Sequence, residues 1–242
     1  MQIVWNTSNP KRIEQAVLTH VRAFGLTVVE AVARLPLLVE GGLTQAELVL
    51  DRLERDGLLA STTLYNDRRC FVPTTAPGTM ARMAEETKTR RFAALSFCCL
   101  GPIARMPVTA EEIRQIFPAL NLRFMPPGYY VQPAAHPVLG YLRVDMCGHG
   151  RWDRVLAKCC HDARRHAQDA GFQDAIAAEQ FEIALVTALP QKAERLSRTL
   201  RTMDSLPAIP IRITSIPELV NLIAPPPDPL PYSFCNSLRN AN

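Results

Sequence analysis

The residues best suited to chemistry in this sequence are two acidic side chains in its second half. Asp145 ends a β-prone run that begins at Gly140, and Glu182 lies at the start of another such run, 181–186. Carboxylates that converge on one point can hold a divalent metal, which then activates water for hydrolysis. If the chain were an active nuclease, Asp145 and Glu182 would be its ligands, and Mg²⁺ or Mn²⁺ its cofactor.

The order of elements around these acids resembles the core of the PD-(D/E)xK nucleases. In that core an Asp follows a Pro on one strand, and an acid-x-Lys sequence lies on the next. Here Gly128 follows Pro127, Arg143 stands where the first acid of the next strand is expected, and no Lys follows Asp145. A guanidinium at position 143 would repel a cation and is well suited to bind a phosphate. The resemblance therefore implies a catalytically silent domain that binds DNA and needs no cofactor.

Zinc binding is a competing interpretation of the same region. The possible ligands are Cys147, His149, Cys159 and His161. Their spacing matches no zinc finger that we can place, and the seven cysteines of the chain are odd in number. We therefore expect reduced, structural thiols and no metal, with zinc as the alternative. No P-loop, dinucleotide-binding glycine motif or Gly-x-Ser-x-Gly is present.

Residues 1–79 have the pattern of a winged helix-turn-helix domain. Apolar residues at helical spacing predict three helices, over 10–24, 28–35 and 45–55. Thr44 and Glu47 make a capping-box pattern at the start of the third helix. Two β-prone runs then predict a hairpin, the wing, over 58–65 and 70–73.

This domain is expected to contact duplex DNA through its third helix and its wing. The candidate residues are Gln45, Arg52 and Arg55 on the helix and Arg68 and Arg69 on the wing. Glutamine can read adenine, and arginine can read guanine or bind a phosphate. The third helix also carries the acidic residues Glu47, Asp51, Glu54 and Asp56, which repel phosphate. A winged helix used for dimerisation or another protein contact is therefore the alternative.

Residues 80–223 are expected to form a restriction-endonuclease-like αβ domain, which makes the fold class α+β. A helical lead-in covers 80–118, and the pattern strand, strand, helix, strand, helix, strand follows it. This order predicts one mixed sheet over 127–213, flanked by helices over 152–168 and 191–202. The remaining residues, 224–242, form a Pro-rich tail.

Basic residues concentrate in this second domain. The candidates for phosphate contact are Arg143, Arg151, Arg154 and Lys158. A later helix carries a stripe at three-residue spacing: Lys192, Arg195, Arg198 and Arg201. Such stripes suit phosphate binding, and the alternative is a pair of solvated helix faces.

The composition limits the class of protein. The 242 residues carry a net charge of +4, which permits a nucleic-acid partner without requiring one. No run of 18 apolar residues and no signal-peptide pattern occurs, so a cytoplasmic protein without membrane contact is expected.

A winged helix followed by a nuclease-like domain resembles the replication-relaxation family of plasmid and mobile-element proteins. Members carry an acid-Val-Asp strand end, then Arg-Gly and a helix with a Lys. Here Arg143-Val144-Asp145, followed by the stretch from Gly148 to Lys158, is similar to that pattern. The resemblance spans 11–223 and implies DNA binding in plasmid replication, transfer or their regulation. The expected partners are duplex DNA, a second copy in a homodimer, and other proteins in a larger DNA-bound assembly.

Overall fold

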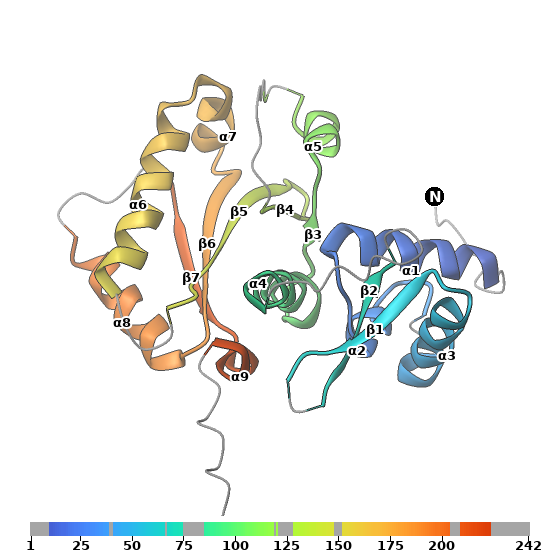
Figure 1. The fold of residues 1–242 in the computed structure, drawn as a ribbon. Helices are drawn as coiled ribbons and strands as arrows, with labels where there is room; N and C mark the ends of the chain where they lie inside the picture. Colours follow the sequence, from blue (N-terminus) through green and yellow to red (C-terminus); the bar gives the residue numbers. More distant parts are fainter. Residues whose placement is uncertain are drawn as a thin grey trace, which may run out of the picture.

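The fold mixes helices with a mixed β-sheet, as the expected α+β class requires (Figure 1). The computed structural model describes residues 10–38, 41–65, 67–74, 85–118, 120, 128–147, 152–203 and 209–223. Within these residues, no helix has the length and apolar character needed to span a membrane.

Three helices and a hairpin make up the N-terminal part. Their bounds are α1 Pro10–Phe24, α2 Val29–Val32, α3 Gly42–Arg55, β1 Leu59–Thr63 and β2 Arg69–Pro73. β1 and β2 pair antiparallel, and a bridge from Thr27 to Phe71 ties the chain before α2 to the hairpin. The apolar stripe of α1 packs against Leu50, Leu53 and Phe71 in one buried cluster. The predicted order of helices and hairpin is therefore confirmed.

Two details of the N-terminal part differ from the expectation. The second helix is a single turn that ends at Val32 rather than Leu35; residues 33 and 34 form turns, and the ring of Pro36 disfavours a helical Leu35. The third helix begins at Gly42, where the backbone has a φ of +56° that glycine adopts easily. Thr44 therefore lies inside α3, and the predicted capping box is wrong.

A five-stranded sheet forms the centre of the C-terminal part. Its strands lie in the order β3 Met106–Pro107, β4 Tyr129–Gln132, β5 Val138–Val144, β6 Phe181–Thr187 and β7 Ile211–Ser215. β3, β4 and β5 pair antiparallel, whereas β5, β6 and β7 pair parallel. The prediction of one mixed sheet over 127–213 is confirmed, but β3 adds a strand from within the expected helical lead-in, 80–118.

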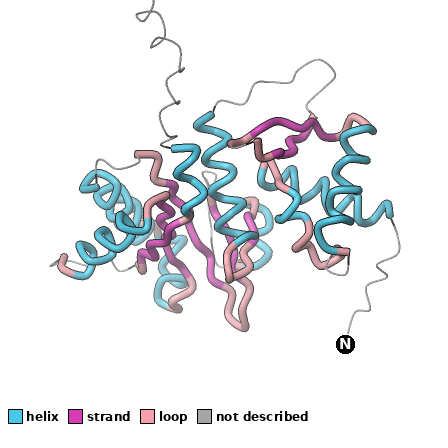
Figure 2. Tube along the Cα trace, turned by 90° about the horizontal axis from the view of Figure 1, so that it is seen from below, coloured by secondary structure: helices cyan, strands magenta, loops and turns pink. Residues whose placement is uncertain are grey.

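Helices cover both faces of this sheet (Figure 2). One face meets α5 Ala110–Ile116, α6 Trp152–Gln168, η2 Ala170–Phe172, α7 Gln173–Ala177 and α8 Pro190–Arg201. The other face meets α4 Glu85–Leu95, the π-helical turn η1 Ser96–Leu100, η3 Pro217–Leu219 and α9 Val220–Ile223. Every residue of β6 is buried, and its side chains alternate between the two layers.

One hydrophobic cluster joins the two parts of the chain. Phe24, Leu26 and Val28 pack in it with Phe92 of α4 and Val186 of β6. Side-chain hydrogen bonds reinforce the contact: Arg91 donates to the carbonyl of Gly25 at 3.1 Å, and Arg34 donates to that of Cys99 at 3.0 Å. The expected boundary at residue 79 and the tail at 224–242 lie outside the described residues.

Gly140 of β5 leaves room for the Tyr130 side chain of β4 to extend over β5 as far as β6. The Tyr130 ring lies over this glycine, and its hydroxyl donates to Glu182 Oε1 at 2.6 Å on the next strand. Glu182 also accepts from Arg212 of β7 at 3.1 Å. A Cβ atom at position 140 would lie 2.0 Å from the Tyr130 ring, which is itself buried.

We expect Gly140→Ala to destabilise the protein by roughly 1–3 kcal/mol, since the new methyl group overpacks a filled core and displaces Tyr130 from Glu182. Urea denaturation followed by circular dichroism measures this change. Gly101→Ala is the matched control, because its added Cβ would meet nothing closer than 3.4 Å. Equal stability of the two variants would show that Tyr130 does not lie across Gly140.

Candidate functional site at the carboxyl ends of β5 and β6

The candidate site lies where the parallel strands β5 and β6 end. Carboxyl ends of parallel strands meet at one sheet edge, and the helices that connect the strands begin there. Asp145 follows β5 directly, and its N–H donates to the carbonyl of Val186 on β6 at 2.8 Å. Figure 1 shows α6 and α8 packed side by side against this part of the sheet.

Asp145 is buried and fully occupied by partners from its own chain. Lys192 Nζ of α8 lies 2.6 Å from Asp145 Oδ2, and the two side chains are only 0% and 1% exposed. The hydroxyl of Thr187 donates to the same oxygen at 3.2 Å. The backbone N–H of Cys147 donates to Oδ1 at 3.0 Å. The Lys192 ammonium therefore already neutralises the negative charge that a metal ion would need from this carboxylate.

Arg143 lies beside this buried pair and faces a second buried carboxylate. Its Nε atom is 2.5 Å from Asp162 Oδ2 of α6. The two atoms form an ion pair, but their angles do not meet those of a hydrogen bond. The Arg143 side chain is 29% exposed. Among the described residues, its two terminal nitrogens make no hydrogen bond or ion pair, so they are open to a ligand.

A small pocket of about 120 Å³ opens at this point. Its basic lining comes from three elements, Arg90 of α4, Arg143 of β5 and Lys158 of α6, and Asp145 and Cys147 also border it. With their direct partners, four cations (Arg90, Arg143, Lys158, Lys192) stand against three carboxylates (Glu86, Asp145, Asp162), which leaves a net charge of +1. The volume is below the ~300–1,000 Å³ of pockets that enclose whole small organic ligands. A single anionic group therefore suits it best.

Two further side chains support the rim. Arg195 of α8 stacks on the Trp152 ring of α6, with the guanidinium 4.3 Å from the ring centroid. This contact fixes the start of α6 against α8. Arg154 precedes Lys158 by one helical turn on α6, and both side chains are exposed. The two charges therefore share one helix face that leads away from the pocket.

The basic stripe expected on α8 is partly wrong. Lys192 was expected on an exposed phosphate-binding face, but it is completely buried against Asp145. The α8 helix turns that position toward the sheet, because Lys192 is followed one turn later by the buried Leu196. Arg195, Arg198 and Arg201 are exposed as expected. Arg151 and His149 lie outside the described residues.

The two wing arginines expected to contact DNA are already paired inside the chain. Arg68 pairs with Glu30 at 3.0 Å, and Arg69 pairs with Asp51 at 2.8 Å and with Glu54. The wing is therefore not the free basic tip that the sequence predicts, since its positive charge is neutralised by acids of α2 and α3.

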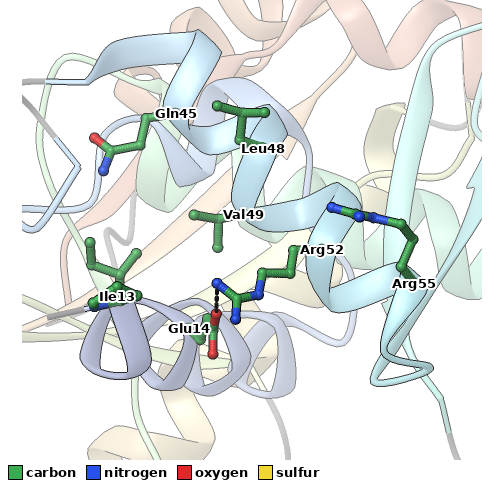
Figure 3. Close-up of a pocket in the computed structure, with 8 residues that line it drawn as sticks. Ile13, Glu14, Gln45, Leu48, Val49, Arg52 and Arg55 are labelled. Atoms are coloured by element: carbon green, nitrogen blue, oxygen red, sulfur yellow. Dashed lines mark ion pairs between the residues drawn. The ribbon is translucent and has the colours of Figure 1, made fainter.

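Residues of the third helix border a groove between α1 and α3, rather than an open surface that could contact DNA bases. Arg52 forms an ion pair with Glu14 of α1 at 3.2 Å (Figure 3). Gln45 and Arg55 border the same groove between α1 and α3. Leu48 lies among them with 63% of its surface exposed.

The alternative metal sites do not assemble among the described residues. Asp145 points to the α8 side of the sheet, whereas Glu182 points to the other side, to Tyr130 and Arg212. The two carboxylates are also about 16 Å apart along the strand direction, at ~3.3 Å per residue. Asp145 and Glu182 therefore cannot share one ion, which corrects that pairing.

Three of the four proposed zinc ligands, Cys147, Cys159 and His161, lie among the described residues, and they do not form a cluster there. Cys159 is buried, and this burial raises the pKa of its thiol to about 12, which disfavours the thiolate that zinc binds. Cys147 and His161 are exposed. In the described part of the chain, no three His, Cys, Asp or Glu side chains converge on a point.

Sequence reasoning missed Lys192, Thr187 and Arg90 as members of this site. The sequence does contain a feature from which the role of Lys192 could be predicted. A lysine in the first turn of a helix opposes the helix dipole, so it indicates a nearby carboxylate. Because α8 follows β6, its first turn must lie at the carboxyl end of that strand, beside Asp145.

Comparison with protein-family models, curated proteins and solved structures finds no match to this chain. Its function is therefore inferred from the sequence pattern and from the geometry of the described residues.

Proposed function

We propose that this protein binds duplex DNA and that its nuclease-like domain holds a backbone phosphate without cutting it. The observation that carries the proposal is the cationic pocket of Arg90, Arg143 and Lys158 beside a carboxylate that Lys192 already neutralises. A phosphate oxygen can accept from the free terminal nitrogens of Arg143 and from the Lys158 ammonium. Arg154 extends the contact along the DNA backbone.

The order of the sheet supports a nuclease-like ancestry of this domain. Three antiparallel strands are followed by a helix and a parallel strand, and the acid that ends β5 has a lysine against it. The lysine comes from α8 rather than from position 147. Gly128, where the first acid of the nuclease pattern would stand, has a φ of +115°, a value that an aspartate adopts only with strain. In this proposal the domain has the sheet of the nuclease pattern but lacks the acidic residues that would bind a metal.

The N-terminal part serves as a winged helix-turn-helix in this proposal. Arg52, Arg68 and Arg69 are paired internally, so this part adds less electrostatic binding energy than the strand-end pocket does. The resemblance to replication-relaxation proteins implies that this DNA binding serves plasmid or mobile-element replication, transfer or their regulation.

A metal-dependent nuclease is the second candidate, and one observation favours it. Lys192 beside Asp145 is an acid–lysine pair of the kind that the strand sequence lacks. No second carboxylate faces Asp145 among the described residues, because Asp162 is held by Arg143 and Glu182 lies across the sheet. A single carboxylate coordinates a divalent metal weakly.

One experiment separates the two candidates. Fluorescence anisotropy with a labelled duplex of mixed sequence, repeated at several salt concentrations, should give an affinity that falls as salt rises. Incubation of supercoiled plasmid with Mg²⁺ or Mn²⁺ should leave it intact. Nicking that disappears in Asp145→Asn would establish the nuclease. Absence of salt-dependent binding would remove the DNA-binding proposal.

A further inference from the structure

An apolar groove lies between α3 and the N-terminal end of α1 (Figure 3). It has a volume of about 410 Å³, and its apolar lining consists of Pro10, Ile13, Leu48 and Val49. Leu48 is 63% exposed, which makes it one of the most exposed large apolar side chains in the described part of the chain. An apolar groove that leaves such a side chain in contact with water is typical of a surface that another segment covers.

The rim of this groove favours an uncharged occupant. Three charged side chains border the groove, and two of them, Glu14 and Arg52, pair with each other at 3.2 Å. The third, Arg55, donates to the backbone carbonyl of Asp51 at 3.4 Å. The groove therefore offers little to a charged partner, whereas an uncharged apolar segment leaves the ion pair in place.

The segment that precedes α1 has this chemistry. We call residues 1–9, which lie outside the described residues, the N-terminal segment. It has no charged side chain, and it contains an apolar run, Ile3-Val4-Trp5, that four polar residues connect to Pro10. Pro10 is both the first residue of α1 and part of the groove lining. The N-terminal segment is therefore joined to the chain at the groove itself.

We propose that the N-terminal segment folds back over the groove and that Trp5 covers Leu48. Trp5 precedes Pro10 by five residues, which span up to ~17 Å when extended, and Pro10 and Leu48 border the same groove. The residue before a proline favours an extended conformation, so the chain leaves α1 without a further helical turn. The indole ring is a large apolar group with one N–H donor, and the side-chain amide oxygen of Gln45 at the rim can accept from it.

Other occupants fit the groove less well. Duplex DNA is disfavoured, because Glu47, Asp51 and Glu54 of α3 repel phosphate. A second copy of this chain would bring a rim whose main charges are already paired, so it adds no charge complementarity. A segment tethered at Pro10 has a local concentration on the order of millimolar, which free partners reach only in concentrated solution.

This contact has a consequence for the third helix and does not depend on DNA binding. The N-terminal segment would cover Gln45 and Arg52, two of the residues that the sequence assigns to DNA, and would close this face of α3 to other ligands. The strand-end pocket belongs to other elements, β5, α4 and α6. The contact is measured without DNA, so its failure is distinguishable from a failure of DNA binding.

Fluorescence of the full chain tests the proposal, because Trp5 and Trp152 are its two tryptophans. In a Trp152→Phe background, acrylamide should quench Trp5 at least about threefold less than in a free peptide of residues 1–9, since the groove shields the ring. Leu48→Asp should remove this protection by placing a carboxylate under the ring. Leu43→Asp is the matched control and should keep the protection: Leu43 is 54% exposed on the same helix but points about 140° away from Leu48.

A cysteine cross-link gives a second readout in which Trp152 is kept. Val4→Cys combined with Leu48→Cys should form a disulfide within one chain under mild oxidation, because the N-terminal segment brings the two positions together. Val4→Cys combined with Leu43→Cys should not form one. Peptide mapping identifies the bond and separates it from bonds to the native cysteines.

Three outcomes would overturn the proposal. The first is a Trp5 that acrylamide quenches as readily as it quenches the free peptide. The second is protection that Leu48→Asp leaves unchanged. The third is protection that grows with protein concentration between about 1 and 100 µM, or a disulfide between two chains, either of which would assign the groove to a second copy.

Discussion

Replacing Lys192 with methionine should lower the free energy of unfolding by about 3–5 kcal/mol, the range for removing one partner of a buried ion pair. The methionine has a similar length, so the packing around α8 is largely kept. The charge of Asp145 would remain, with 1% of its side chain exposed and its ammonium partner gone. The hydrogen bonds from Thr187 and Cys147 do not replace that charge. Urea denaturation measures the loss.

Two variants distinguish this effect from a general sensitivity of α8. Arg198→Met lies on the same helix, but the Arg198 side chain is 73% exposed, so its loss should cost less than about 1 kcal/mol. Adding Asp145→Asn to Lys192→Met removes the stranded charge and should restore much of the lost stability. If Lys192→Met were as stable as Arg198→Met, the buried pair at the strand ends would not exist as described.

Reversing two charges on α6 should weaken binding to duplex DNA by roughly a hundredfold, because each reversal removes a phosphate contact and adds repulsion. The variant is Arg154→Glu with Lys158→Glu. Both side chains are exposed, and neither forms a salt bridge with another described residue. The slope of log affinity against log salt should fall by about 2, one unit for each lost contact. Anisotropy titrations with the labelled duplex measure both quantities.

The control must carry the same change of net charge at a distant place. Arg114→Glu with Arg164→Glu serves this purpose, since Arg114 lies on α5 and Arg164 lies on α6, about 120° around the helix axis from Lys158. This control should lose much less affinity. Equal losses in the two variants would mean that DNA responds only to net charge. Arg143 is a poorer probe, because its loss would also leave Asp162 buried without a counter-ion.

The fold could be predicted from local patterns where burial dictates the residues. The all-apolar centre of β6 and the helical stripes of α1, α6 and α8 place these elements without any knowledge of tertiary contacts. Likewise, the bounds of α6 and α8 follow closely from the sequence. The start of α3 did not, since Gly41 and Gly42 allowed the helix to begin before the threonine that resembles a cap.

The site was less predictable, because a charged side chain gives no local sign of its partner. The pairing of Arg69 with Asp51 and Glu54 joins residues 15 to 18 positions apart and depends on how the hairpin packs on α3. The burial of Lys192 likewise depends on the crossover from β6 to α8. Arg143, by contrast, was placed at the strand end by its sequence pattern, and it lies in the pocket there.

Protection of Cys147 by DNA tests the central claim most directly. Cys147 lines the strand-end pocket and is exposed, whereas Cys70, Cys98, Cys159 and Cys160 are buried. Its alkylation by a maleimide can be followed peptide by peptide with mass spectrometry. Saturating duplex DNA should slow the labelling of Cys147 at least about tenfold in low salt and release it in high salt. It should leave the labelling of a cysteine introduced by Arg114→Cys on α5 unchanged. If bound DNA left the rate at Cys147 unaltered, the nucleic acid would lie elsewhere on the protein, and the strand-end pocket would not be its binding site.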